Sequence, residues 1–215
     1  MLLSISRYSR NWQKYPDIKI MFTGIVEATG KVLELVSDNT NMHFKIESPV
    51  SHELKVDQSV AHNGVCLTVT KVEGSSHWVT AIAETLTKSN LGVLKPLQTV
   101  NLERCMKADG RFDGHIVQGH IDQTATCEQI NDQNGSYVFR FSFKPGKDAL
   151  VVEKGSICIN GVSLTCFNVA ADSFEVAIIP FTWEHTNFKD LKKGDRVNLE
   201  FDILGKYIKA LIEKR

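Results

Sequence analysis

The feature that most constrains the fold of this chain is an internal repeat. The hexapeptide NGVCLT at 63–68 returns as NGVSLT at 160–165, which lies 97 positions further on (160 minus 63). The same spacing maps the tetrapeptide VNLE at 100–103 onto VNLE at 197–200. Sustained self-similarity of this kind indicates one supersecondary module written twice. A module of roughly ninety residues can bury its own core, so we expect two copies of one small domain.

The spacing between the copies changes near their start. Phe44 matches Phe141 at the spacing of 97, whereas Gly24 matches Gly119 at a spacing of 95. We therefore expect a length difference of two residues between these two matches.

Differences between the copies indicate chemistry rather than fold. Asn-Gly is a turn dipeptide, and the alternating residues after it predict a strand that leaves a tight turn in each copy. Within that shared strand, Cys66 in the first copy is replaced by Ser163 in the second. If the two modules face each other, the pair forms a pseudo-symmetric site with unlike groups at matching positions. Such a site suits a reaction that handles two similar molecules differently.

Short β-branched runs separated by turn residues predict an all-β fold. Residues 43–47, 65–72 and 78–82 alternate between apolar and polar types, and Gly74 and Pro96 interrupt the runs. Strands at this spacing favour a barrel or a sandwich over a βαβ layout, and a closed barrel leaves no exposed sheet edge. Short helical pieces are expected at 49–54, 85–91, 147–151 and 182–188.

The composition excludes several classes of partner. The 215 residues carry 25 basic and 25 acidic side chains, so no net charge draws the chain to nucleic acid or to an anionic membrane. No apolar run approaches the length of about eighteen residues that a membrane span needs. The five cysteines include no C-x-x-C pair, which argues against a metal site. Scattered thiols are usual in a reducing compartment, so we expect a cytoplasmic protein.

Residues 1–20 belong to neither copy. They hold four basic residues against one acid, with several serines, and this pattern has some similarity to a transit peptide. The first module, however, restarts at its own methionine, Met21, so we interpret 1–20 as an upstream extension that is disordered. The first domain is then expected at 21–115 and the second at 116–202, joined through the turn-rich segment 108–114.

The last segment, 203–215, has the pattern of an amphipathic helix. Leu204, Tyr207, Ile208 and Leu211 recur every three or four positions, which places them on one helical face. A helix this short is not stable in water alone, so its apolar face needs a partner. Two partners remain open: the protein's own barrel, or the same helix from other chains.

Individual candidate residues carry little information by themselves. Cys66 could be a small buried hydrophobe or a nucleophile, and His120 could be structural or catalytic. Ser163 and Thr165 are common strand residues, and Asp202 could simply end a strand. The chain has no G-x-S-x-G elbow, no G-x-G-x-x-G and no Walker phosphate loop, so the usual hydrolases and nucleotide enzymes are not favoured.

Four motifs in order resemble the riboflavin synthases of the trimeric, two-barrel type. They are MFTGIVE at 21–27, AHNGVCLTVT at 61–70, GHIVQGHID at 114–122 and NGVSLT at 160–165. The resemblance covers the chain from Met21 to its end. It implies an all-β fold of two tandem six-stranded antiparallel Greek-key barrels, with a C-terminal helix at 203–215 that holds a homotrimer together.

The resemblance also implies an activity. Members of this family are transferases that catalyse the last step of riboflavin biosynthesis. Two molecules of 6,7-dimethyl-8-ribityllumazine give riboflavin and 5-amino-6-(D-ribitylamino)uracil by transfer of a four-carbon unit. The reacting site lies between the first barrel of one subunit and the second barrel of its neighbour. No metal or organic cofactor is needed, and the expected partners are the substrate and further copies of this chain.

By family position, five residues are implied in catalysis. His120 is the acid/base candidate, while Ser163 and Thr165 line the ring pocket of the second barrel. Asp202 assists addition to the donor ring. Cys66 takes the position of the family's site cysteine, either as a nucleophile or as a polar wall. The implied substrate-binding residues are Phe22, Thr23, Gly24, Ile25, Val26, Cys66, Leu67, Thr68, Thr80, Ala81, Ile82, Ala83, Glu84, Thr85, Gly119, His120, Ile121, Lys154, Ser163, Leu164, Thr165, Ile179, Pro180, Phe181, Thr182, Trp183 and Glu184.

Two features of the sequence depart from the family pattern. Asp113 stands in the linker where the family has another glycine. Phe181 and Trp183 are bulkier than the residues expected at the pocket edge. They either stack on the second lumazine ring or fill the rim of the barrel.

A non-catalytic relative is the main alternative to an enzyme. Lumazine proteins share the duplicated barrel and bind a lumazine or flavin as an optical antenna, but they lose the site cysteine and the second histidine of the interdomain motif. This chain keeps both Cys66 and His120, which favours the enzyme. A flavin-binding barrel of an oxidoreductase is not favoured either, because the chain has no nicotinamide-binding βαβ half.

Overall fold

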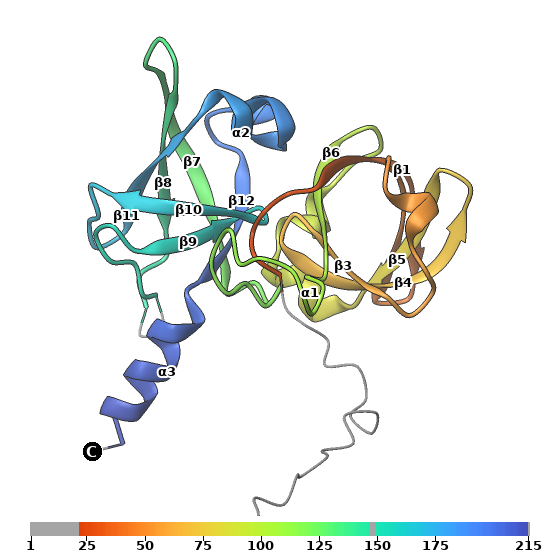
Figure 1. The fold of residues 1–215 in the computed structure, drawn as a ribbon, viewed down its shortest axis with the longest axis horizontal. Coiled ribbons are helices and arrows are strands. Elements are labelled where there is room, and N and C mark those ends of the chain that lie inside the picture. The colour runs from red at the N-terminus through yellow and green to blue at the C-terminus, as the bar shows by residue number, and fades with distance from the viewer. Residues whose placement is uncertain (1–21, 147–148, 215) are drawn as a thin grey trace, which may run out of the picture.

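Two closed β-barrels stand side by side in the computed structural model, which describes residues 22–146 and 149–214 (Figure 1). Each barrel closes from six strands, and the paired strands are antiparallel. This architecture confirms the expected all-β fold of two tandem six-stranded barrels. The extension expected at 1–20 lies outside the described residues.

The two barrels have the same strand order. The strands of the first are β1 (Ala28–Asp38), β2 (Asn41–Glu47), β3 (Ser59–His62), β4 (Val65–Glu73), β5 (Ser76–Ala81) and β6 (Thr99–Arg104). The strands of the second are β7 (Gln123–Asp132), β8 (Tyr137–Phe143), β9 (Ser156–Ile159), β10 (Val162–Phe167), β11 (Ser173–Ile178) and β12 (Arg196–Phe201). Around the circumference the order is β1-β2-β5-β4-β3-β6 in one barrel and β7-β8-β11-β10-β9-β12 in the other.

Short helical segments follow equivalent strands in both barrels. Helix α1 (Ala83–Lys88) follows β5, and helix α2 (Pro180–His185) follows β11. A 3₁₀ turn comes next in each copy, at Asn90–Val93 and at Asn187–Asp190, and another lies at Ser51–Glu53. Helical structure is therefore confirmed near three of the four expected positions, while the described part of the fourth forms no helix.

The register of the strands places the length difference between the copies later than expected. Phe44 pairs with Val79 in the first barrel, and Phe139 pairs with Val176 in the second. Since Val79 and Val176 are equivalent at the spacing of 97, Phe44 corresponds to Phe139, and the expected match with Phe141 is wrong. A shift of two residues keeps each side chain on the same face of a strand, so alternating phenylalanines match in either alignment. The two extra residues lie in the connection from β8 to β9.

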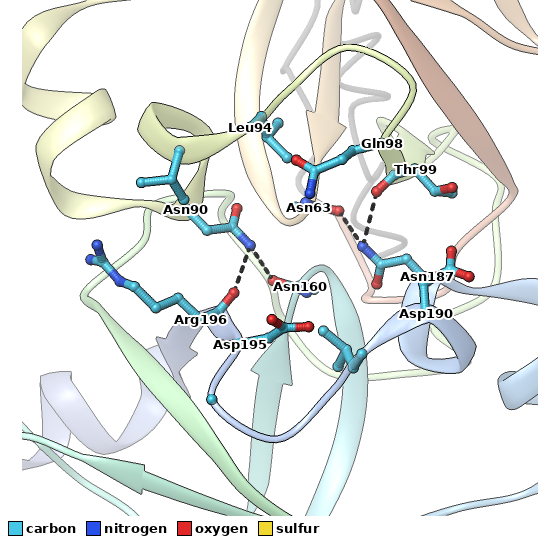
Figure 2. Close-up of a pocket in the computed structure, with 13 residues that line it drawn as sticks. Asn63, Asn90, Leu94, Gln98, Thr99, Asn160, Asn187, Asp190, Asp195 and Arg196 are labelled. Carbon is cyan, nitrogen blue, oxygen red and sulfur yellow. Dashed lines mark hydrogen bonds between the residues drawn. The ribbon is translucent and has the colours of Figure 1, made fainter.

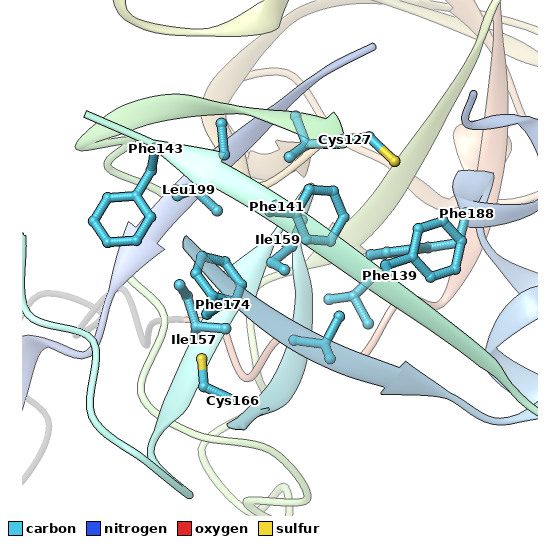
Figure 3. Close-up of a cluster of buried hydrophobic side chains, with 14 of the residues drawn as sticks. Cys127, Phe139, Phe141, Phe143, Ile157, Ile159, Cys166, Phe174, Phe188 and Leu199 are labelled. Carbon is cyan, nitrogen blue, oxygen red and sulfur yellow. The ribbon is translucent and has the colours of Figure 1, made fainter. Parts of the chain in front are cut away.

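The two barrels have the same strand topology but different kinds of side chain in their cores. In the second barrel Phe139 contacts Phe188 edge to face, with ring centroids 5.2 Å apart, and Phe141 packs on Phe174 at 5.9 Å (Figure 3). Aromatic pairs of this kind add about 0.5–1.5 kcal/mol beyond their burial. The first core is mainly aliphatic and includes Val32, Ile46, Leu54, Val60, Val69, Val79, Val100 and Leu102.

Buried asparagines join the two barrels around an approximate two-fold axis. The side-chain amide of Asn101 donates to the carbonyl of Asn160 (2.8 Å), and that of Asn198 donates to the carbonyl of Asn63 (2.9 Å). The six asparagines of this network are Asn63, Asn90 and Asn101 with their equivalents Asn160, Asn187 and Asn198. Four of them, Asn63, Asn90, Asn160 and Asn187, line a cleft of about 250 Å³ (Figure 2). Because buried amides need partners, this network fixes one barrel against the other.

The chain ends in α3 (Ile203–Ile212), which projects away from the second barrel (Figure 1). Asp202 caps the helix by accepting a hydrogen bond of 2.9 Å from the backbone N–H of Leu204. Tyr207 and Leu211 are 64% and 66% exposed. The described part of the chain therefore leaves the apolar face of this helix uncovered.

Candidate active site

Two segments that lead into the barrels run alongside each other near the two-fold axis. The backbone N–H of Phe22 donates to the carbonyl of Val117 (2.8 Å), and the N–H of Val117 donates to the carbonyl of Phe22 (3.1 Å). Both side chains are buried in one small apolar cluster. We call residues 22–25 and 117–120 the crossing segments, because each one precedes its own barrel and then lies against the other.

Each crossing segment bonds to the strand of the opposite barrel that carries a predicted site residue. The backbone N–H of Cys66, on β4, donates to the carbonyl of Gly119 over 2.9 Å. The N–H of Ser163, on β10, donates to the carbonyl of Gly24 over 2.8 Å. A Cβ atom on Gly119 would lie 2.5 Å from Cys66 Cβ, and one on Gly24 would lie 2.7 Å from Ser163 Cβ. Both glycines also have positive φ, so the close approach requires glycine.

Two buried glutamates hold the crossing segments in place. Glu103, at the end of β6, accepts hydrogen bonds from the backbone N–H of Thr23 (2.7 Å), from its hydroxyl (2.9 Å) and from the N–H of Gly24 (3.0 Å). Glu200, at the end of β12, accepts from the three consecutive amides of 118–120 over 2.6, 2.9 and 2.9 Å. Burial raises the pKa of each carboxyl group to about 7, although the amide hydrogen bonds act in the opposite direction.

The first-barrel pocket lies beside Cys66. It has a volume of about 320 Å³ and brings Cys66 together with His120, which is exposed on the crossing segment. Glu84 and Lys88 at its edge form an ion pair of 2.8 Å on α1. The lining residues are Val65, Cys66, Glu84, Thr85, Lys88, Ser89, Gly119, His120 and Ile121.

The second-barrel pocket lies beside Ser163. Its volume is about 520 Å³. Lys154 stands at its edge with Nζ 5.4 Å from the centre of the Phe167 ring. The lining residues are Lys154, Ser163, Leu164, Thr165, Phe167, Ala177, Ile179 and Thr182.

His115 is a candidate site residue that the sequence reasoning missed. Its Nδ1 lies 2.7 Å from the hydroxyl oxygen of Ser163. Burial lowers the pKa of His115, while the carboxylate of Asp202 acts in the opposite direction. A signal was present, because the Gly-His pair at 114–115 is written again at 119–120 within the same motif.

Several predicted site residues lie away from the two pockets. Phe22, Leu67 and Ala81 are buried in apolar clusters and line neither pocket. Asp202 caps α3 and lines a separate groove of about 540 Å³ between that helix and the residues around Leu150. Its carboxylate is nevertheless close enough to His115, the partner of Ser163, to raise the pKa of that histidine against the larger lowering by burial.

The two aromatic residues that depart from the family pattern have different surroundings. Trp183 stacks on Tyr137 with ring centroids 3.7 Å apart and contacts the core of the second barrel. Phe181 is 67% exposed and stacks on His185 at 4.1 Å. Trp183 therefore fills the barrel rim, whereas Phe181 presents an open face beside the second-barrel pocket.

The described residues contain no grouping that suits a metal ion. Within 22–146 and 149–214, histidine, cysteine, aspartate and glutamate nowhere gather in threes at ligand distances. None of the helices in those ranges combines the length and hydropathy that a membrane-spanning helix needs.

Known proteins are similar to this chain over most of its length. The lumazine binding domain family matches residues 23–105 and 118–202. Riboflavin synthase of Actinobacillus pleuropneumoniae is 41% identical, with 91% of each chain covered. That of Bacillus subtilis (strain 168) is 36% identical, with 90% of this chain and 91% of the relative covered. The crystal structure of LumP complexed with riboflavin superposes with a TM-score of 0.77 at 22% identity, over 84% of this chain and 99% of LumP.

The fold and the paired pockets define a tandem lumazine-binding barrel protein, since each barrel matches the lumazine binding domain once. The likeness to LumP supports this fold alone. Within this class of barrel protein, the relatives that match about nine tenths of the chain are riboflavin synthases. The chain belongs to the riboflavin synthase family.

Proposed function

We propose that this chain catalyses the riboflavin synthase reaction. Two molecules of 6,7-dimethyl-8-ribityllumazine react, and one donates a four-carbon unit to the other. The products are riboflavin and 5-amino-6-(D-ribitylamino)uracil. Two copies of one compound supply every atom of both products, so the reaction consumes no oxidant and no second substrate. The enzyme is a transferase of the cytoplasm, a compartment whose reducing conditions suit its scattered cysteines.

The observation that carries this proposal is a pair of equivalent pockets with unlike polar groups. Cys66 and Ser163 occupy matching positions on β4 and β10, and each lies under the crossing segment of the other barrel. His120 has Ile25 as its counterpart, so only the first-barrel pocket places an imidazole at that position. A common scaffold binds two identical molecules, and the unlike groups assign them different roles.

Holding two flat heterocycles against each other is the largest contribution the protein can make. Effective molarities of well-oriented reactants correspond to roughly 7–11 kcal/mol of barrier. Pre-formed pockets of about 320 and 520 Å³ are large enough for one small heterocycle each.

Proton transfer in the first-barrel pocket is assigned to His120. The methyl group at ring position 7 of the lumazine must lose a proton before it can attack the second ring. A placed histidine accelerates such a step by about 10²–10⁴-fold. His120 is exposed on the pocket wall next to Cys66, and its backbone is held by Glu200, so its side chain can reach a bound ring.

The second-barrel pocket is assigned to the donor molecule. Ser163 and His115 form a hydrogen-bonded pair that can bind a polar edge of the ring, with Thr165 beside them. Lys154, which lines this pocket, and backbone groups of the crossing segments are proposed to bind the ribityl hydroxyls. Asp202 is proposed to assist addition to this ring from the start of α3.

The complete active site is proposed to form between chains of a homotrimer. The apolar face of α3 is more than half exposed at Leu204, Tyr207 and Leu211, which suits packing against the same helix of other copies. In the proposed trimer, the first-barrel pocket of one chain faces the second-barrel pocket of its neighbour.

Turnover of a single substrate tests the proposed function. Purified protein is mixed with 6,7-dimethyl-8-ribityllumazine alone, under nitrogen and with a chelator. Riboflavin is expected at half the molar amount of the lumazine consumed, with an equal amount of the uracil product. Tight binding of the lumazine without turnover would instead show an antenna protein and overturn the proposal.

A further inference from the structure

We propose that Glu103 and Glu200 are positioning residues that act crosswise between the barrels. Each carboxylate belongs to the last strand of its own barrel, yet it holds a segment that bonds the backbone of a pocket residue, Cys66 or Ser163, in the other barrel. The proposal rests on the proposed function only in treating the two pockets as substrate pockets.

The hydrogen bonds of both side chains fit a carboxylate and not a neutral amide. Glu103 and Glu200 are 5% and 2% exposed, and each accepts three hydrogen bonds from a crossing segment. All of these partners are N–H or O–H donors, which a side chain with acceptors alone can satisfy together. Hydrogen bonds to an ionised acceptor are about twice as strong as neutral ones.

The two glutamates lie on equivalent strands and make equivalent contacts. They come from the repeated VNLE segments, 97 positions apart, and both pair across the sheet with the strand that precedes the Asn-Gly turn. The same device is therefore present in both barrels. If either glutamate served only to pack its own barrel, the two would not both need to bond a crossing segment.

Glu200 controls the first-barrel pocket through two neighbouring groups. It holds the N–H of Gly119, whose carbonyl accepts from the N–H of Cys66, and the N–H of His120, whose side chain lines the same pocket. Loosening this carboxylate would therefore move His120 relative to Cys66. A displacement of about 1 Å at a reacting group can lower a rate about a hundredfold.

Glu103 controls the second-barrel pocket in the same way. It holds the N–H of Gly24, whose carbonyl accepts from the N–H of Ser163. No histidine follows Gly24, so the effect on this side is on Ser163, which lines the pocket, and on its partner His115. The effect of either glutamate thus appears in the barrel that does not contain it.

Amide hydrogen exchange in Glu200→Gln and Glu103→Gln tests this crossed pattern. We expect the amide of Cys66 to exchange about tenfold faster or more in Glu200→Gln, while the amide of Ser163 changes little. In Glu103→Gln the amide of Ser163 is expected to exchange faster and that of Cys66 to change little. Glu175→Gln is the matched control, because Glu175 lies on β11 and its carboxylate accepts a hydrogen bond from the exposed side chain of Asn168, which follows β10.

The outcomes separate positioning from simple destabilisation. Equal acceleration of both amides in both variants would show general loosening of the fold and overturn the proposal, as would no change in either. If the glutamine variants do not fold, Glu200→Asp and Glu103→Asp carry the same comparison with shorter carboxylates. Because exchange is measured without substrate, a wild-type protein that lacks turnover would refute the proposed function and leave this test intact.

Discussion

The backbone N–H of Cys66 donates to the carbonyl of Gly119 over 2.9 Å, although the two residues belong to different barrels. The pair formed by Ser163 and Gly24 repeats this relationship at 2.8 Å on the other side of the two-fold axis. The first-barrel pocket therefore takes part of its wall, including Gly119 and His120, from the segment that leads into the second barrel. In the second-barrel pocket, the backbone of the lining residue Ser163 is bonded to the segment that leads into the first barrel. A first barrel cut from this chain would lack one wall of its pocket, and a second barrel would lack the carbonyl that bonds the backbone of Ser163.

Replacing His120 tests the acid/base assignment. His120→Gln keeps a polar side chain on the wall of the first-barrel pocket but cannot accept a proton near neutral pH. Turnover is expected to fall by at least about tenfold, while the affinity for the lumazine changes little. Steady-state kinetics and fluorescence titration with substrate measure the two effects. An unchanged turnover number would remove His120 from the chemistry.

Removing one interface asparagine tests the coupling of the barrels. Asn101→Ala deletes the side chain that bonds the carbonyl of Asn160 and the backbone N–H of Asn187, and it leaves both groups buried without those partners. A loss of about 2–4 kcal/mol in the free energy of unfolding is expected.

Denaturant titration followed by circular dichroism measures this loss. Asn131→Ala is the control, because that side chain accepts a hydrogen bond from the exposed Gln129 and should change stability by less than about 0.5 kcal/mol. Equal stabilities for both variants would show that the asparagine network does not hold the barrels together.

A buried pair of histidines distinguishes the first barrel from the second. His62 Nδ1 lies 3.1 Å from the carbonyl of Val60, so it carries the proton, and its Nε2 accepts from His77 Nε2 over 2.9 Å. His77 Nδ1 then accepts from the hydroxyl of Ser51 at 2.8 Å. Both rings are neutral in this chain of bonds. Burial lowers the pKa of His62 to about 3 and that of His77 to about 4.

Acid should therefore weaken the first barrel through these histidines. Their folded pKa values lie below the ordinary value of about 6.5, so the unfolded chain binds protons that the folded chain does not. Their stabilising effect is complete above about pH 6.5 and is lost as the pH falls toward 4. The loss at pH 5 is about 2 kcal/mol for each histidine. The raised pKa values of Glu103 and Glu200 act in the opposite direction.

A double replacement isolates this contribution. The second barrel has Ile159 and Phe174 at the equivalent positions, so His62→Ile with His77→Phe reproduces an apolar pair that the fold already accepts. Between about pH 7.5 and pH 5, this variant should lose at least about 2 kcal/mol less stability than the wild type. Parallel pH dependence of the two proteins would contradict the effect.

Deleting the exposed tail tests the proposed assembly. A chain that ends at Ile203 lacks the helix whose residues are nowhere buried, so both barrels should still fold. Light scattering is expected to show monomers, and activity should fall by at least about tenfold because the site needs two chains. Leu211→Glu is a milder variant with the same expected direction. Fully active monomers would refute the shared-site proposal.

The sequence predicted the fold well because the repeat gave two independent views of each strand. The strand at 65–72 and the helix after Asp202 follow from alternation and from helical spacing, which depend on local residues alone. Alignment of Phe44 failed because strands tolerate slips of two residues. The pairing of β2 with β5, compared with that of β8 with β11, settles the register.

The candidate site was harder to predict than the fold. Family motifs pointed to Cys66, His120 and Ser163, and the structure places each of them in a pocket. His115 and Glu200 were missed because their partners lie 48 and about 80 positions away in the sequence. No local sequence pattern indicates that each crossing segment lies against the barrel that it does not lead into.

The most direct test of the central claim uses isotopic mixing. Lumazine labelled with ¹³C in its two methyl groups and the ring carbons that carry them is mixed with an equal amount of unlabelled lumazine. Because each riboflavin takes its new ring from two substrate molecules, mass spectrometry should find unlabelled, half-labelled and fully labelled product, with the half-labelled form about twice as abundant as either other. Riboflavin without the half-labelled form would contradict the account, since it would mean that each product arises from a single lumazine.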